Sequence, residues 1–198
     1  GTDSHLWFGW RHGEAEDLAE FARRLPRMVR FVSEFGSGSP PRSAPFIDEE
    51  LLVNEWPGLD WDRLAAEHGY ERSTFERLFP PNDFDTYEEW RDTTQHYQSH
   101  VLKVQIEALR RLKYRPTGGF CFSSLNDSAP AISTSILDAD RVPKFACDAV
   151  QAACACVLVV IDAQPGFYPS ARSDVDRTLF AAALERGAWV AGVAAALD

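Results

Sequence analysis

Long apolar runs are missing from this 198-residue sequence, and a stretch such as residues 154–161 is far too short to span a bilayer. A membrane-spanning helix needs about 20 apolar residues, so no helical membrane segment is predicted. The first 20 residues also lack the basic start and apolar stretch of a secretory signal. We therefore expect no membrane association and a cytoplasmic location.

Basic residues are scarce as well. The 20 Lys and Arg residues stand against 30 Asp and Glu, which gives a net charge of −10. This charge opposes nonspecific attraction to the phosphate backbone of DNA or RNA. Nucleic acid is therefore not expected as a partner.

Metal-binding patterns are also lacking. The four cysteines include one Cys-x-Cys but no pair of C-x-x-C knuckles, and we expect them to be buried thiols: Cys121, Cys147, Cys154 and Cys156. His96 and His100 are spaced to share one helix face, yet no Glu-x-x-His pattern surrounds them, so we expect an ordinary solvated or packed face. No metal and no other cofactor is predicted.

The first half of the chain alternates helical and extended patterns. Residues 14–25 predict a short amphipathic helix that Pro26 ends, and the apolar run 28–33 predicts a buried strand. A loop rich in Gly, Ser and Pro follows directly at 36–41. Short helices are predicted at 61–67 and 73–78, in a region where we expect packing and no chemistry.

The second half repeats this alternation. Thr86 with Glu89 three residues later is typical of a capping box. Steps of three and four then predict a long helix with one buried stripe, formed by Tyr87, Trp90, Thr94, Tyr97, Val101, Val104, Ala108 and Leu112. A break at 116–119 precedes a predicted strand at 120–125 and a helix at about 143–153. The order predicts an α/β protein with a parallel sheet or barrel.

Glu34 comes directly after the first predicted strand. Barrel enzymes place catalytic groups at this C-terminal end of a strand. A plain structural role, in which Glu34 ends the strand and pairs with an arginine such as Arg30, explains the same position. The residue pattern alone leaves both interpretations open.

Four ordered segments share a resemblance that bears on this choice. Residues 30–36 (RFVSEFG) resemble the nucleophile motif of glycoside hydrolase family 2, especially its β-mannosidase branch, where this glutamate ends the seventh barrel strand. Residues 4–10 (SHLWFGW) resemble the segment after the sixth strand, and 118–127 the eighth strand. Residues 133–138 (STSILD) with Pro143 and Lys144 are similar to the segment before the final helix. Residues 1–156 are thus expected to be the C-terminal part of a (β/α)8 TIM barrel, strands 7 and 8 with their helices.

The resemblance implies retaining hydrolysis of a β-glycoside, in which one carboxylate attacks the anomeric carbon while a second, about 5 Å away, protonates the leaving oxygen. Glu34 would be the nucleophile. The substrate-binding residues would be His5, Trp7, Trp10, Asn126 and Asp127. Ordinary loop packing remains the other explanation for His5 and the two tryptophans. The expected partner is a carbohydrate, a β-mannoside by the branch resemblance alone.

Two departures from the family limit these expectations. Tryptophans expected in the eighth strand and in Ser-Trp-Ser are replaced by Ser123 or its neighbour and by Thr134. The family's acid/base, in an Asn-Glu pair at the end of the fourth strand, would lie before residue 1. The Asn54-Glu55 dipeptide lies elsewhere in the order of elements, and we do not expect it to replace that pair.

The tail differs in character. Residues 157–162 are rich in β-branched side chains, and residues 158–167 (LVVIDAQPGF) resemble the opening strand of isochorismatase-like cysteine hydrolases, with Asp162 in the position of the triad aspartate. Residues 157–198 are therefore expected to be a second, incomplete α/β segment. The other interpretation is an exit strand of the glycosidase chain itself.

Three functions follow from these patterns. The first is a retaining β-glycosidase that lacks its acid/base half and is expected to be inactive alone. A truncated or rearranged gene, or a fragmentary gene model, would produce such a sequence. The second is a noncatalytic half-barrel that binds carbohydrate or completes a second chain supplying the rest of the barrel. The third is the start of a cysteine hydrolase.

Overall fold

The computed structural model describes residues 3–158 of the chain. The chain divides into two compact units, residues 1–154 and 155–198, and nearly all the described residues belong to the first. The predicted tail segment, with Asp162, lies almost wholly outside the described residues, so its fold stays a prediction. Within residues 3–158, no helix combines the length and apolar character that crossing a membrane requires.

Three short strands form a parallel sheet. β1 (Asp3–His5), β2 (Phe31–Glu34) and β3 (Gly119–Phe120) lie side by side in that order. Parallel neighbours need a crossover connection, and helices supply it: α1 (Asp17–Arg24) joins β1 to β2, while α5 (Tyr87–Arg111) ends the longer connection from β2 to β3. The predicted α/β class with a parallel sheet is confirmed, whereas the eight-stranded barrel stays a prediction.

The sheet buries one of its faces. Ser4 and Val32 are buried, whereas their neighbours Asp3, His5 and Phe31 are exposed. Successive side chains on a strand point to opposite faces. The face that carries Val32 packs on the apolar core, and the face that carries His5 and Phe31 is open among the described residues.

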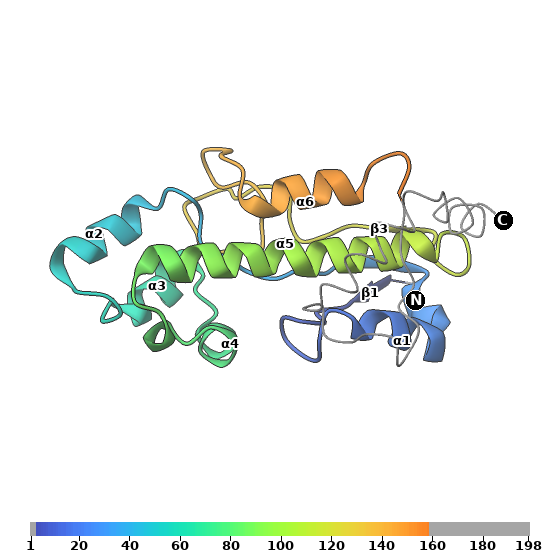
Figure 1. Cartoon of the computed structure of the whole chain (residues 1–198), viewed down its shortest axis with the longest axis horizontal. Helices are drawn as coiled ribbons and strands as arrows, with labels where there is room; N and C mark the ends of the chain where they lie inside the picture. Colours follow the sequence, from blue (N-terminus) through green and yellow to red (C-terminus); the bar gives the residue numbers. More distant parts are fainter. Residues whose placement is uncertain (1–2, 159–198) are drawn as a thin grey trace, which may run out of the picture. The chain divides into compact units, whose positions relative to one another are not determined.

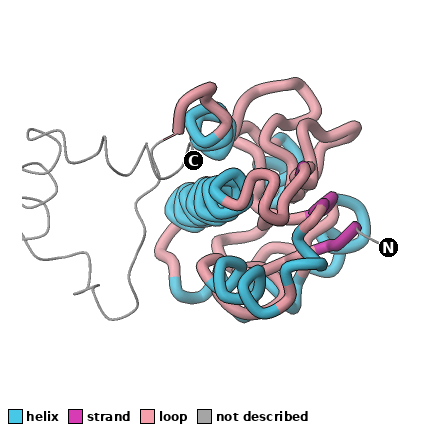
Figure 2. Tube along the Cα trace, turned by 90° about the vertical axis from the view of Figure 1, so that its right-hand side faces the viewer, coloured by secondary structure: helices cyan, strands magenta, loops and turns pink. Residues whose placement is uncertain are grey.

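The remaining helices lie along α5. α2 (Pro45–Val53), α3 (Trp61–His68) and α4 (Arg72–Leu78) surround its first half, and α6 (Phe145–Ala153) packs against it (Figure 1). Seen nearly down the axis of α5, α6 lies on one side of it and α1 on the other (Figure 2). α5 is therefore the common support of both halves of this unit.

Two apolar clusters form the core on either half of α5. The first joins the sheet, α1 and α6 through Val32, Phe35, Leu102 and Ile106. The second is aromatic, and packs Trp10, Tyr70 and Phe75 around Trp90 of α5 with ring centroids 5.0–6.3 Å apart. The region at 46–81 contributes mainly to this second cluster, in agreement with the packing role expected for it.

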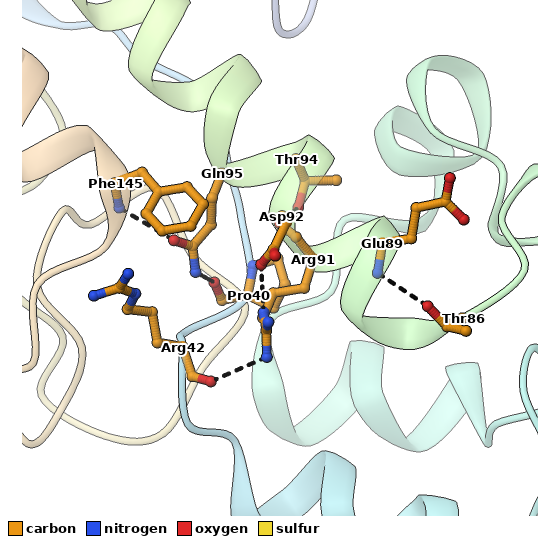
Figure 3. Close-up of polar contacts among 9 residues, drawn as sticks. All are labelled: Pro40, Arg42, Thr86, Glu89, Arg91, Asp92, Thr94, Gln95 and Phe145. Atoms are coloured by element: carbon orange, nitrogen blue, oxygen red, sulfur yellow. Dashed lines mark hydrogen bonds and ion pairs between the residues drawn. The ribbon is translucent and has the colours of Figure 1, made fainter.

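Sequence signals at the helix ends are largely confirmed. The Thr86 hydroxyl accepts a hydrogen bond from the Glu89 N–H at 3.2 Å and caps α5 (Figure 3). The Glu89 carboxylate accepts from the Asp85 N–H rather than from the Thr86 N–H, so the capping box is only half formed. α1, α3, α4 and α6 match the predicted helices to within about three residues.

Both predicted strands differ from the structure. The run 28–33 begins as a 3-10 turn, Pro26–Val29, and the strand starts only at Phe31. Pro26 supplies a first turn with no N–H to satisfy, which favours the helical start. The second predicted strand at 120–125 shrinks to Gly119–Phe120. Beyond Phe120 the chain still bonds to the segment after β2, through Cys121 N to Val32 O and Ser123 N to Phe35 O, without forming a regular ladder.

The buried stripe of α5 was predicted correctly only in part. Tyr87, Trp90, Thr94 and Val101 are buried, but four other members of the predicted stripe are half-buried, namely Tyr97, Val104, Ala108 and Leu112. Leu102, Ile106 and Leu109 are fully buried in their place. Because α5 has neighbours on opposite sides, its buried surface is wider than a single stripe.

Three glutamines of α5 are also fully buried, namely Gln95, Gln98 and Gln105. Gln98 alone has four hydrogen-bond partners: the two hydrogens of its Nε2 are shared among Ser37 O, Thr134 O and Ser135 O at 2.8–3.2 Å, and its Oε1 accepts from Ser39 Oγ at 2.8 Å. Gln95 accepts from Phe145 N at 3.1 Å and donates to Pro40 O at 2.9 Å (Figure 3). These amides supply partners to loop backbone groups that would otherwise be buried unpaired.

Replacing Gln98 by alanine should lower the free energy of unfolding by about 2–4 kcal/mol, because several buried partners lose their hydrogen bonds together. Urea unfolding followed by tryptophan fluorescence measures this change. The matched control is Gln151→Ala, at an exposed position of α6, which should stay within about 0.5 kcal/mol of the wild type. Equal effects of the two substitutions would contradict this role of Gln98.

Candidate active site

Glu34 lies at the C-terminal end of the central strand. Backbone hydrogen bonds hold the chain on both sides of it: Leu6 N donates to Glu34 O at 2.8 Å, and Ser123 N donates to Phe35 O at 3.0 Å. The segments after β1 and β3 therefore both support this strand end. The side chain itself remains 42% exposed, as a group that reacts with an incoming substrate requires.

His5 is brought next to Glu34 by an irregular register. β1 pairs with β2 as Asp3 with Phe31 and Ser4 with Val32, but His5 then pairs with Glu34 because a bulge interrupts the ladder. His5 Nδ1 lies 3.3 Å from the Glu34 carboxylate. With a regular register the histidine would face Ser33 instead.

A second carboxylate lies on the other side of the imidazole. His5 Nε2 is 3.8 Å from Asp3 Oδ2, and the Ser33 hydroxyl donates a hydrogen bond to Asp3 Oδ1. His5 thus stands between two carboxylates. Since these side chains are about half exposed, solvent screening weakens their mutual attraction. Arg30 makes no ion pair with Glu34 among the described residues, which removes that structural explanation for the glutamate.

The two candidate tryptophans are buried. Trp7 is 8% exposed, with the Arg11 guanidinium 4.7 Å from its ring centroid. Trp10 is 0% exposed and packs edge-on against Phe75 at a centroid distance of 5.0 Å. Neither ring offers the open face that sugar stacking needs, so the structure supports the packing interpretation for both.

Trp10 still matters to the site through the loop after β2. A Cβ on Gly38 would lie 2.9 Å from Trp10 Cζ2. Only a residue without a side chain lets the loop backbone lie this close to the indole. The buried Trp10 ring therefore packs against the loop that follows Glu34 and supports it at Gly38.

Asn126 and Asp127 follow β3 but turn to different partners. Asn126 is exposed and donates from Nδ2 to Asp127 O at 3.1 Å. The Asp127 carboxylate accepts from Ser133 Oγ at 2.7 Å and from Ser135 Oγ. Among the described residues, neither side chain has a hydrogen bond or ion pair with Glu34 or His5, so Asp127 orders its own loop.

Three residues that organise these loops were not predicted as functional from the sequence, namely Gln95, Gln98 and Lys144. The glutamines lie within the buried face of α5 at helical spacing, and this was the available signal.

Thiol burial was predicted wrongly. Cys121, Cys154 and Cys156 are exposed and Cys147 is half-buried. Cys154 and Cys156 follow the end of α6, where the chain leaves the core, and Cys121 follows the two-residue strand β3. All four are free.

The histidine pair and the Asn54-Glu55 dipeptide have structural surroundings. His96 packs near the Phe145 ring at 4.7 Å, and His100 Nε2 lies 3.0 Å from Glu16 Oε1. Residues 3–158 contain no cluster of three or more potential metal ligands. Asn54 follows α2 and donates to Glu50 Oε2 at 3.0 Å, at no strand end.

Gly36, two residues after Glu34, has a backbone that other residues rarely adopt. Its φ is +132°, and a Cβ there would lie 3.3 Å from both Leu102 Cδ2 and Ser123 O. Gly36→Ala should lower the free energy of unfolding by about 1–3 kcal/mol, because strain and crowding add at this position.

The control is Gly118→Ala, where the added Cβ would meet its nearest atom, Arg30 O, at an ordinary 3.5 Å. Urea unfolding of both variants measures the difference, and Gly118→Ala should change stability by less than about 1 kcal/mol. An effect at Gly118 as large as that at Gly36 would contradict the geometric argument.

Comparison with known proteins adds one similarity that carries weight. No family model matches the chain, and no curated protein matches it.

Among solved structures, the β-D-mannosidase from Dictyoglomus thermophilum superposes with a TM-score of 0.66 and 26% sequence identity, over 83% of this chain and 20% of that enzyme. A GH2 β-galacturonidase from Eisenbergiella tayi, bound to glycerol, superposes with a TM-score of 0.43 and 13% identity, over 75% of this chain and 22% of that protein; this second likeness is too weak to support an argument. The chain thus spans about a fifth of the length of the mannosidase that it matches, and its fold is similar to part of a glycosidase.

Proposed function

We propose that this chain supplies the nucleophile side of a retaining β-glycosidase site, with Glu34 as the attacking carboxylate. The observation that carries the proposal is the position of Glu34: an accessible carboxylate at the C-terminal end of the central parallel strand in a fold similar to part of a β-D-mannosidase. This is the strand end from which barrel enzymes act.

The surroundings of Glu34 suit a nucleophile. No lysine or arginine forms an ion pair with it among the described residues, and the one ionisable side chain in polar contact with it there is His5, at 3.3 Å. Among the described residues, no lysine or arginine therefore competes with an anomeric carbon for this carboxylate. His5, on the same open face of the sheet, is positioned to contact a sugar hydroxyl beside it. A β-mannoside is the proposed substrate because of the mannosidase similarity.

Retaining hydrolysis needs a second carboxylate about 5–5.5 Å from the first, to protonate the leaving oxygen. The neighbouring strand ends do not offer one: β1 ends at His5, and Cys121 follows β3. We propose that the acid/base comes from outside residues 1–198, from a longer protein or a second chain that supplies further strands. Within the part of the chain that the structure describes, the open face of the sheet and its two outer strands are free for that assembly.

Residues 1–198 alone should not hydrolyse an aryl β-mannoside measurably. General acid–base assistance is typically worth 10²- to 10⁴-fold in rate, and its donor is proposed to lie elsewhere. Release of nitrophenol from the purified chain is the measurement. Turnover that disappears in Glu34→Gln would contradict this expectation, because it would mean that the chain holds a complete site.

When the chain is combined with the remaining part of a related barrel, Glu34 should form a covalent glycosyl ester. A 2-fluoro-β-mannoside with an activated leaving group traps such an ester. The fluorine slows both formation and hydrolysis of the ester, and the activated leaving group restores only its formation. Peptide mass spectrometry then identifies the labelled residue.

Two variants make this labelling experiment specific. Glu34→Gln should abolish the label, whereas Glu55→Gln, at the other Asn-Glu dipeptide, should retain it. Label on Glu55 would overturn the assignment of Glu34. A folded, complemented barrel that carries no label would favour the noncatalytic function, in which the chain only binds carbohydrate or completes its partner.

A further inference from the structure

Lys144 is a fully buried cation between the two loops that follow β2 and β3. Its side chain is 2% exposed, although it directly precedes the surface helix α6. Nζ donates to Ser39 O at 2.8 Å, to Ser133 O at 3.2 Å and to Ser133 Oγ at 3.4 Å. The three hydrogens of the ammonium thus have three acceptors, all of them neutral.

The acceptors belong to a contact that links the two loops, which we call the Ser39–Ser133 bridge. Ser39 N donates to Ser133 O at 2.9 Å, and Ser133 N donates to Ser39 O at 3.2 Å. Ser39 lies five residues after Glu34, and Ser133 Oγ donates onward to the Asp127 carboxylate at 2.7 Å. The bridge therefore connects the segment after the proposed nucleophile to the segment after β3.

The lysine is not needed to satisfy this bridge. Both carbonyls already accept a backbone N–H across it. Burial moreover lowers the pKa of Lys144 to about 8 from its ordinary 10.5, although the carboxylates of Asp127 and Asp138 oppose that shift. A pKa lower in the folded than in the unfolded state means that the charge opposes folding at neutral pH.

What the ammonium does provide is conformational specificity. Any compact rearrangement that slides one loop past the other would leave a buried charge without an acceptor, which is strongly disfavoured. Global unfolding, by contrast, hydrates the charge. Lys144 therefore selects one arrangement of the two loops among compact states without adding to the stability of the fold.

We propose that Lys144 is a positioning residue, which fixes the loop after β3 against the loop after Glu34 by holding the Ser39–Ser133 bridge in a single register. Its relevance to catalysis rests on the proposed glycosidase function. The positioning itself is a property of the chain that can be measured without activity.

The test compares the full chain with Lys144→Met and with the control Lys103→Met, at a lysine about half exposed on α5. Hydrogen–deuterium exchange at pH 7 should be at least tenfold faster at the Ser39 and Ser133 amides in Lys144→Met, while the urea midpoint is unchanged or higher. Lys103→Met should leave exchange at both amides unchanged. Unchanged exchange in Lys144→Met would overturn the proposal, and so would a lower urea midpoint with exchange faster throughout the unit, because Lys144 would then be merely stabilising.

The pH dependence gives a second readout. Between pH 8 and 10.5 the unfolded chain binds a proton at Lys144 that the folded chain does not, so stability should rise with pH relative to Lys144→Met. The ratio of the two unfolding constants should change by up to about tenfold per pH unit. A ratio that is independent of pH would show that burying the Lys144 ammonium does not oppose folding. That result would contradict the claim that the buried charge fixes the loops without stabilising the fold.

A functional arm separates this proposal from the proposed function. In a complemented barrel that labels at Glu34, Lys144→Met should slow labelling at least tenfold and leave its site unchanged, while Lys103→Met labels like the wild type. Unchanged labelling in Lys144→Met would show that the bridge does not position the site. If the wild type does not label at all, the glycosidase proposal fails, and the exchange experiment still decides the role of Lys144.

Discussion

Loops that leave the ends of buried strands carry backbone N–H and C=O groups into the protein interior, and each of these groups needs a partner. In this chain α5 supplies many of those partners from glutamine side chains. Gln98 bonds to the loop after β2 through Ser37 and Ser39, and to the loop after β3 through Thr134 and Ser135. The path of both loops therefore depends on one turn of one helix.

This dependence explains why so short a sheet can present an ordered strand end. The three strands have only two to four residues each, too few for the ladder alone to orient the chain beyond them. Apolar packing of Leu102 and Ile106 holds the sheet against α5, and the amides one turn earlier hold the loops. Glu34 follows the residues of β2 that pack on α5 and precedes the loop that the glutamines bind, and its side chain is partly exposed to solvent.

The helices could be predicted because their signals are local. Caps, proline breaks and apolar spacing act within a few residues, and Thr86 of α5 confirms this directly. The strands were predicted less well, since a strand extends only as far as its neighbours pair with it. Phe122 continues the apolar run that predicted a strand, but no regular ladder forms there, so β3 ends at Phe120. Burial of Gln95 and Gln98 was not predicted either, because their partners lie 36 to 61 residues away in sequence.

The sequence by itself determined the α/β order of elements, the start of the long helix and the location of Glu34 at a strand end, since all three depend on neighbours along the chain. Tertiary structure alone decided what surrounds that glutamate. The irregular register between β1 and β2 places His5 beside it, the loop backbone at Gly38 packs closely against the buried Trp10, and the Ser39–Ser133 bridge encloses Lys144. The physical reason is that each of these contacts joins segments distant in sequence, so their geometry is set only when the sheet register and the packing on α5 are established together.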